Sequence, residues 1–290
     1  MLDSEEYYHT YKEWLDFKDE LIYSNRFFPK SNMRAKIKKL IVKCEDYIDE
    51  GNIFFRAREY TLNSVHEMSD LIAEEKRVKD IKNTMLRSLI LAANKDDIWS
   101  IHIKDPISRS LIEKMEKTSE WGYSKDESGM PNREKAGLNR ASPKYISYLY
   151  LANDVNTSLA EARAQIRQEF SVAQYKIIEP LRIVNFLKSI KLHKNTEEKS
   201  KEIILYNSIR QAFSAPSSTD EKDYIVSQYI AEYIKKLGFQ GIAFGSSRRK
   251  GGINYTLFND DACEFIKSEL YIVKNIEITS EKFFPPRKNI

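Results

Sequence analysis

The sequence predicts an α+β protein, with a mixed β core surrounded by helices and an α-helical N-terminal region. Short β-prone segments alternate with helical segments of unequal length, so the regular repeat of a doubly wound sheet is absent. Residues 120–143 are rich in Gly, Ser, Asn and Pro, which is typical of a long loop. The 290 residues are 41% hydrophobic and 31% charged, with only 9 Gly and 8 Pro, so a large core is expected and a disordered chain is excluded.

The first fifty residues are expected to form two helices, because apolar side chains recur three and four positions apart along them. These side chains are Trp14, Phe17 and Leu21, then Met33, Ile37, Leu40, Ile41, Cys44 and Ile48. Pro29 separates the two helices, Ser31 is the expected N-cap of the second, and Gly51 is its expected stop. Aromatic and charged residues at 52–59 then predict the first strand.

Helical spacing returns at residues 64–117, where two or three helices are expected. After the long loop, further elements follow in order. They are a strand at 148–152, a helix from about 157 to 168, β-prone stretches around 175–186, a helix near 201–213 and a strand at 253–258. Another helix is expected from the capping box at Ser218 and Glu221 to Gly238, followed by a Gly-rich turn at 241–244.

Composition excludes several classes of function. No apolar run approaches the roughly 18 to 20 residues that cross a membrane, and the acidic start MLDSEEYY is unlike a signal peptide. We therefore expect a cytoplasmic protein without a membrane partner. The net charge of +4 is too small to indicate a nucleic-acid binder. The four histidines lie far apart and the two cysteines form no zinc motif, so no metal is expected.

Two polar features in the predicted elements are candidates for chemistry. Arg56 and Arg58 alternate in the first strand, so both guanidinium groups reach one face and one anionic group. The alternative is that they keep an edge strand soluble. Glu161 lies in the small, apolar helical stretch SLAEARA. The alternative interpretation is that Glu161 is an ordinary solvated residue of the helix.

A third candidate is the segment GSSRRKGG at residues 245–252, between two strands. Its glycines let backbone N–H groups approach a ligand, and its basic residues supply positive charge. The hydroxyls of Ser246 and Ser247 are suitable donors to a phosphate or a ribose. The segment lacks the spacing of a P-loop and leads into no helix, and a charged hairpin loop is the alternative.

The order of these features resembles the RES domain family, which is named after an arginine, a glutamate and a serine. The matching stretches are FFRAR, GLNRASP before YLYLA, NTSLAE, the pair SQ in a later helix, and GIAFGSSR before NYTLF. They cover about residues 52–60 and 129–260. The resemblance implies a fold similar to that of ADP-ribosyltransferase toxins. It also implies an activity that degrades NAD+ or transfers ADP-ribose, often as the toxin of a toxin–antitoxin pair.

Carried over by position, Arg56, Glu161 and Ser246 match the three name-giving residues and are the expected catalytic residues. The expected NAD+-binding residues are Tyr150, Arg140, Ser247, Asn254 and Arg58. Three other positions depart from the family pattern. They are Ser142 where an asparagine is frequent, Tyr145 where a glycine is, and Phe244 where a tyrosine is.

The resemblance implies two parts: a helical N-terminal region, residues 1–51, and a RES-type catalytic domain, residues 52–279, with a helical insertion at about 61–128. It implies an NAD+ glycohydrolase or phosphorylase that takes NAD+ as substrate, needs no cofactor, and serves in toxin–antitoxin or anti-phage defence. An antitoxin, an activating protein or a homo-oligomer would restrain or trigger it.

Two alternatives stay open at this point. One is an ADP-ribosyltransferase that modifies a protein. The other is a binding module without enzyme activity, which would use a basic helix face and the segment 245–252 against nucleic acid. That face consists of Arg34, Lys36, Lys38, Lys39 and Lys43.

Overall fold

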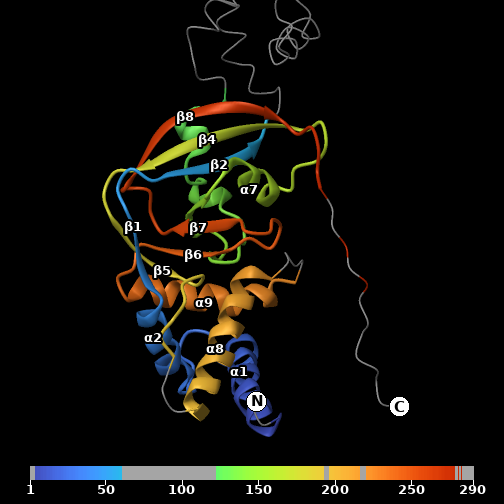
Figure 1. Ribbon diagram of the computed structural model, residues 1–290. Helices are drawn as coiled ribbons and strands as arrows, with labels where there is room; N and C mark the ends of the chain where they lie inside the picture. Colours follow the sequence, from blue (N-terminus) through green and yellow to red (C-terminus); the bar gives the residue numbers. More distant parts are fainter. Residues whose placement is uncertain are drawn as a thin grey trace, which may run out of the picture.

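The computed structural model describes residues 4–60, 122–192, 196–215, 220–277, 280 and 282. In these ranges eight strands form one sheet, with four helices grouped below it in Figure 1. The strands are β1 (Glu45–Ile48), β2 (Ile53–Glu59), β3 (Leu149–Ala152), β4 (Glu169–Ile177), β5 (Leu181–Asn185), β6 (Gly241–Gly245), β7 (Ile253–Leu257) and β8 (Cys263–Ile272). The helices are α1 (Ser4–Tyr23), α2 (Met33–Lys43), α6 (Lys125–Ser128), α7 (Val155–Glu161), α8 (Thr196–Ser214) and α9 (Lys222–Lys236), with a short 3-10 turn, η3 (Arg133–Lys135).

The sheet is mixed, in the order β1-β5-β6-β7-β3-β2-β4-β8. Every neighbouring pair is antiparallel except β5 with β6. Parallel neighbours need a long crossover connection, and here it contains α8 and α9. Helices grouped at one end of a mostly antiparallel sheet define an α+β fold, so the predicted class is confirmed.

The four grouped helices share one hydrophobic core with β6. Its buried side chains include Phe17 of α1, Ile37 of α2, Phe213 of α8, Ile230 of α9 and Phe244 of β6. The ring of Phe17 also lies 5.7 Å from the ring of Tyr229 on α9. The N-terminal helices are therefore packed into the main core.

A second cluster of buried side chains lies among the strands themselves. It joins Phe54 of β2 and Tyr175 of β4 to Leu151 of β3 and Leu257 of β7. In Figure 1 the sheet bends so that β2, β4 and β8 lie above β6 and β7. The short helix α7 packs against β2 and β3, beside this bend.

The second predicted helix is too long. α2 ends at Lys43, and residues 45–48 form β1, which pairs with β5. Pairing gives the backbone of this segment hydrogen-bond partners that a helix end lacks. Glu45 also accepts two hydrogen bonds from Arg182 of β5, at 2.9 and 3.0 Å. This contact across the sheet overrides the helical spacing.

The segment 241–244 is a strand, not the predicted turn. A Cβ at Gly241 would lie 2.7 Å from Cδ2 of Leu257 and 2.8 Å from the carbonyl oxygen of Thr256. The glycine therefore allows close approach between β6 and β7 and makes no turn. The last strand, β8, is not anticipated by the sequence pattern.

Helix α7 begins at Val155 and ends at Glu161, whereas the pattern predicts residues 157–168. It ends early because Arg163 and Arg167 adopt positive φ angles of 58° and 69°, which no α-helix contains. The expected strands at 52–59, 148–152 and 253–258 and the expected helices near 201–213 and before Gly238 are confirmed. The helices expected at 64–117, and Ser218, lie outside the described residues.

Within the described ranges, no helix is long and apolar enough to cross a membrane. In the same ranges, no three His, Cys, Asp or Glu side chains gather closely enough to hold a metal ion.

Candidate functional site

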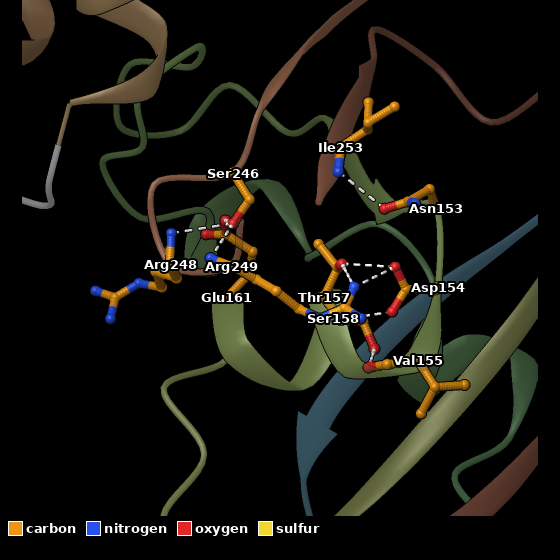
Figure 2. A network of polar contacts seen from close by, with 10 residues as sticks. All are labelled: Asn153, Asp154, Val155, Thr157, Ser158, Glu161, Ser246, Arg248, Arg249 and Ile253. Atoms are coloured by element: carbon orange, nitrogen blue, oxygen red, sulfur yellow. Dashed lines mark hydrogen bonds and ion pairs between the residues drawn. The ribbon is translucent and has the colours of Figure 1, made fainter. Parts of the chain in front are cut away.

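Helix α7 presents a carboxylate at its C-terminal end. Asp154 caps the N-terminus, where its Oδ1 accepts a hydrogen bond of 2.9 Å from the N–H of Thr157. The helix then ends on Glu161, whose side chain is half-buried. Because α7 is short and begins at the Asp154 cap, Glu161 lies next to the turn that follows β6 (Figure 2).

Glu161 is held through one oxygen only. Its Oε1 accepts a hydrogen bond of 2.6 Å from the hydroxyl of Ser246 and one of 2.7 Å from the amide of Asn254. Among the described residues, Oε2 has no hydrogen-bond partner. The two donors fix the orientation of the carboxylate, so Oε2 is the oxygen that remains for a ligand.

The hydroxyl of Ser246 has a defined orientation. It accepts hydrogen bonds of 3.1 Å from the backbone N–H groups of Arg248 and Arg249. Both lone pairs are then occupied, so its proton points to Glu161. Ser246 is therefore a donor that stabilises the carboxylate. This geometry does not make it a nucleophile.

Asn254 comes from the centre of the sheet. It lies on β7, opposite Ala152 of β3 and Phe244 of β6. Its side chain is buried, and donating to Glu161 satisfies its amide where solvent is absent. The strand pairing therefore fixes the distance between this amide and the end of α7.

Tyr150 lies on β3 next to a loop from the long polar segment. Its hydroxyl is 2.8 Å from the hydroxyl of Ser142 in that loop. Burial raises the pKa of Tyr150 far above its usual range, so the phenol is a neutral hydrogen-bonding group. The serine that replaces the frequent family asparagine thus supplies the contact to Tyr150.

Arg140 is in the same loop and binds the end of α8. Its guanidinium donates to the carbonyl oxygens of Ala212, at 2.9 Å, and Ala215, and it lies over the ring of Tyr224. A cation at a helix C-terminus is favourable because the last carbonyls lack helical partners. Burial lowers the pKa of Arg140, while the charge of Glu161 is among the groups that oppose this. Arg140 therefore lies near the carboxylate but is engaged with α8.

Two buried polar residues of α9 attach this loop to the helix. The hydroxyl of Ser227 donates to the carbonyl of Arg140 at 2.7 Å. The amide of Gln228 donates to the carbonyls of Asn139, at 2.8 Å, and Ser142, at 3.3 Å. Ser227 and Gln228 therefore position the loop that contacts Tyr150.

We expect Ser227→Ala to lower the free energy of unfolding by about 1 to 2 kcal/mol, because the carbonyl of Arg140 loses its hydrogen-bond donor. Urea unfolding followed by circular dichroism measures this. Ser189, which is exposed, provides the control, and Ser189→Ala should change stability by less than about 0.5 kcal/mol. If both substitutions changed the free energy of unfolding by the same small amount, Ser227 would not attach this loop to α9.

Arg56 and Arg58 form a separate cationic pair on β2. The guanidinium of Arg56 donates to the carbonyl oxygens of Ser128, at 2.8 Å, and Gly129, and that of Arg58 donates to Gly129 at 2.8 Å. Burial, and then the charge of Arg58, lowers the pKa of Arg56 to about 10. Neither arginine forms an ion pair with a carboxylate among the described residues. Two partly buried cations held only by carbonyls are suited to an anionic ligand.

The structure thus brings Glu161, Ser246 and Asn254 into direct contact. Tyr150 and Arg140 lie in the adjoining loop and strand. Arg56 and Arg58 lie on β2, which pairs with β3, the strand that carries Tyr150. Ser247 is exposed in the turn and takes no part in the hydrogen bonds around Glu161.

Sequence reasoning did not identify Asp154 or Thr157 as part of this site, and it expected Arg249 only as a positive charge of the segment 245–252. The guanidinium of Arg249 donates to Asp154 at 2.7 Å and to the hydroxyl of Thr157 at 2.9 Å (Figure 2). An aspartate three residues before a threonine at a helix start is a recognisable capping signal. The partner arginine is 95 residues away in the sequence, and no local pattern indicates it.

Tyr145 accounts for one departure from the family pattern. Its φ angle is 72°, in the left-handed region that favours glycine. The chain thus keeps the backbone conformation that a glycine allows, although a tyrosine occupies the position. Its side chain is exposed, so the larger residue meets no steric obstacle.

The basic face of α2 is partly neutralised. Lys36 pairs with Glu13 of α1 at 2.5 Å, and Lys43 pairs with Glu202 of α8. The guanidinium of Arg34 lies over the ring of Tyr233. These contacts attach α2 to its neighbours and leave less charge for a nucleic acid.

A family model described as the RES domain matches residues 115–277. This range contains α7, the loop of Arg140 and the turn between β6 and β7, residues 246–252, which we call the β6–β7 turn. It excludes α1, α2 and β2. No curated protein matches the chain.

Proposed function

The chain belongs to the RES domain family, and from this premise we propose that it consumes NAD+ by cleaving the bond between nicotinamide and ribose. The observation that carries the proposal is the carboxylate of Glu161, with Oε1 held by Ser246 and Asn254 and Oε2 without a partner among the described residues. A negative charge beside a ribose is the group that this reaction needs.

The chemistry explains that need. As the glycosidic bond breaks, its electron pair leaves with nicotinamide, which becomes neutral, and positive charge develops on the ribose. A fixed carboxylate stabilises this oxocarbenium-like state more than the ground state, which lowers the barrier. When water attacks the ribose carbon, Oε2 of Glu161 accepts the proton that the water loses. The products are nicotinamide, ADP-ribose and a proton.

The other residues bind the rest of NAD+. Arg56 and Arg58 bind the diphosphate, because a planar guanidinium fork matches phosphate oxygens and an anion offsets the unfavourable burial of two positive charges. Tyr150 stacks on the nicotinamide ring. The exposed side chains of Ser247, Arg248 and Lys250 face the solvent side of the ligand.

The acceptor decides the class of reaction. Water gives a glycohydrolase, inorganic phosphate gives a phosphorylase, and a protein side chain gives an ADP-ribosyltransferase. We favour water or phosphate, so that the protein acts as a toxin or defence effector by draining NAD+. Such an enzyme harms its own cell, and an antitoxin, an activating protein or an assembly state restrains it.

The test is release of nicotinamide from NAD+ by the purified protein, with and without inorganic phosphate. The mass of the second product identifies the acceptor: ADP-ribose for water, or its 1-phosphate for phosphate. Absence of release under all these conditions would contradict the proposal. A salt-sensitive gel shift with non-specific DNA or RNA would then favour the binding-module alternative.

We expect Asn254→Ala to lower kcat about 10- to 100-fold, because a hydrogen bond to a charged group is removed from Oε1 of Glu161. Steady-state nicotinamide release measures this. Asn259, which is exposed just beyond β7, provides the matched control, and Asn259→Ala should keep the original kcat. Equal activity of both variants would exclude a role of the Asn254 amide.

A further inference from the structure

The β6–β7 turn, residues 246–252, runs beside α7 and is joined to both ends of this helix (Figure 2). At the C-terminal end, Ser246 donates to Glu161. At the N-terminal end, one nitrogen of the Arg249 guanidinium donates to Asp154 and to Thr157. The helix that carries the carboxylate and the turn that carries its hydroxyl partner therefore hold each other in place.

Arg249 also orients Ser246 through its backbone. Its N–H donates to the Ser246 hydroxyl at 3.1 Å, and its carbonyl accepts from the N–H of Gly252 at 3.0 Å. The side chain of Arg249 is anchored on α7 while its main chain sets the direction of the hydroxyl proton. A change at the anchor would consequently move a donor that positions Ser246.

Close packing limits other arrangements of the turn. A Cβ at Gly252 would lie 2.8 Å from the Thr157 side chain and 3.1 Å from the Cβ of Ser246. Thr157 is fully buried. Its hydroxyl donates to Asp154 at 2.7 Å, so Thr157 links the cap of α7 to the packed turn. The turn therefore rests on the helix without a gap.

Asp154 is suited to hold the arginine. Burial opposes its ionisation, but hydrogen bonds from Thr157 and the charge of Arg249 outweigh this and keep the pKa of Asp154 below its usual value. The carboxylate is therefore charged at neutral pH. It binds the helix N-terminus and the arginine at the same time.

We propose that Arg249 is a positioning residue. Through Asp154 and Thr157 it holds the β6–β7 turn on α7, and thereby keeps the Ser246 hydroxyl directed at Oε1 of Glu161. It acts through these groups and does not touch the substrate. The kinetic part of this inference rests on the proposed function.

The first experiment compares Arg249→Ala with the original protein in steady-state nicotinamide release. We expect kcat to fall about 10- to 100-fold with KM nearly unchanged, because misplacement of a catalytic pair affects the chemical step more than binding. Arg249→Lys should retain more activity than Arg249→Ala, since a lysine still reaches Asp154 with one charge. An unchanged kcat overturns the inference, and so does a raised KM with full kcat, which would make Arg249 a substrate contact.

A double-mutant cycle tests whether Asp154 and Arg249 act together. Asp154→Asn keeps an oxygen that caps α7 but removes the charge that binds Arg249. The double variant Asp154→Asn with Arg249→Ala should be no less active than the more damaged single variant. Fully additive losses in kcat would overturn the shared role.

Arg182 provides a matched control. Its ion pair with Glu45 has a similar length and exposure, 2.9 Å and 38%/28%, compared with 2.7 Å and 39%/33% for Arg249 with Asp154. It joins β1 to β5, away from the site. Arg182→Ala should leave kcat unchanged. If it lowered kcat as much as Arg249→Ala does, general destabilisation would explain both losses, and the inference would be overturned.

Amide hydrogen exchange separates this inference from the proposed function. In Arg249→Ala, the amides of residues 248 and 249 should lose protection, while those of β7 keep theirs. Unchanged protection of both amides overturns the inference whatever the activity. Absence of nicotinamide release by the original protein contradicts only the proposed function. In that case the hydrogen-exchange result by itself decides whether Arg249 holds the turn in place.

Discussion

Glu161→Gln is expected to lower the rate of nicotinamide release from NAD+ about 100- to 1000-fold. The glutamine keeps an oxygen at the place of Oε1, where the Ser246 hydroxyl and the Asn254 amide both donate. It removes the negative charge that, in the proposed reaction, stabilises the developing ribosyl cation. The size and hydrogen bonds of the side chain are thus preserved, and the charge alone is changed.

Steady-state kinetics at saturating NAD+ measures this effect, and thermal unfolding checks the fold. Glu269 of β8 provides the control, because it is another half-buried glutamate that accepts hydrogen bonds, from Gln174 and Lys267. Glu269→Gln should keep the original rate. If the original protein released nicotinamide and Glu161→Gln retained full turnover, Glu161 would not be the catalytic carboxylate.

Phe17→Ala is expected to lower the free energy of unfolding by about 3 to 5 kcal/mol. Phe17 is fully buried on α1, and its ring packs against Tyr229 of α9 and lies 6.0 Å from that of Trp14. Truncation leaves a cavity between helices that come from distant parts of the chain. A change of this size corresponds to a decrease in Tm of roughly 10 °C.

Differential scanning calorimetry measures the shift, and Leu15 on the same helix provides the control. Leu15 is 39% exposed, so Leu15→Ala should change the free energy of unfolding by less than about 1 kcal/mol. If the two substitutions had equally small effects, α1 would contribute little to the stability of the protein. A large effect of Phe17→Ala alone would establish that α1 and the sheet unfold as one unit.

Much of the secondary structure follows from local patterns. The alternating residues at 53–59 form β2, and the periodic apolar residues before Gly238 form α9. The errors have a common cause. Residues 45–48, 241–244 and 263–272 are strands because each finds a partner strand far away in the sequence, which for 241–244 is β5, and local spacing carries no information about that partner.

Candidate residues of the site could likewise be identified from motifs, but their relation could not. Glu161 and Ser246 are 85 residues apart in sequence and 2.6 Å apart in space. Arg140, expected only at the ligand, is also bound to the end of α8. Side-chain type indicates what a residue is able to bind, whereas the pairing of strands and the packing of helices select which of those partners is within reach.

The sequence by itself determined the α+β class and the order of polar motifs that resembles one family pattern. These properties depend on composition, periodicity and order along the chain. Only the tertiary structure decided that Oε1 of Glu161 is held and that Arg249 joins the β6–β7 turn to α7. Both depend on hydrogen bonds between distant segments, which form only when burial of the core brings those segments together.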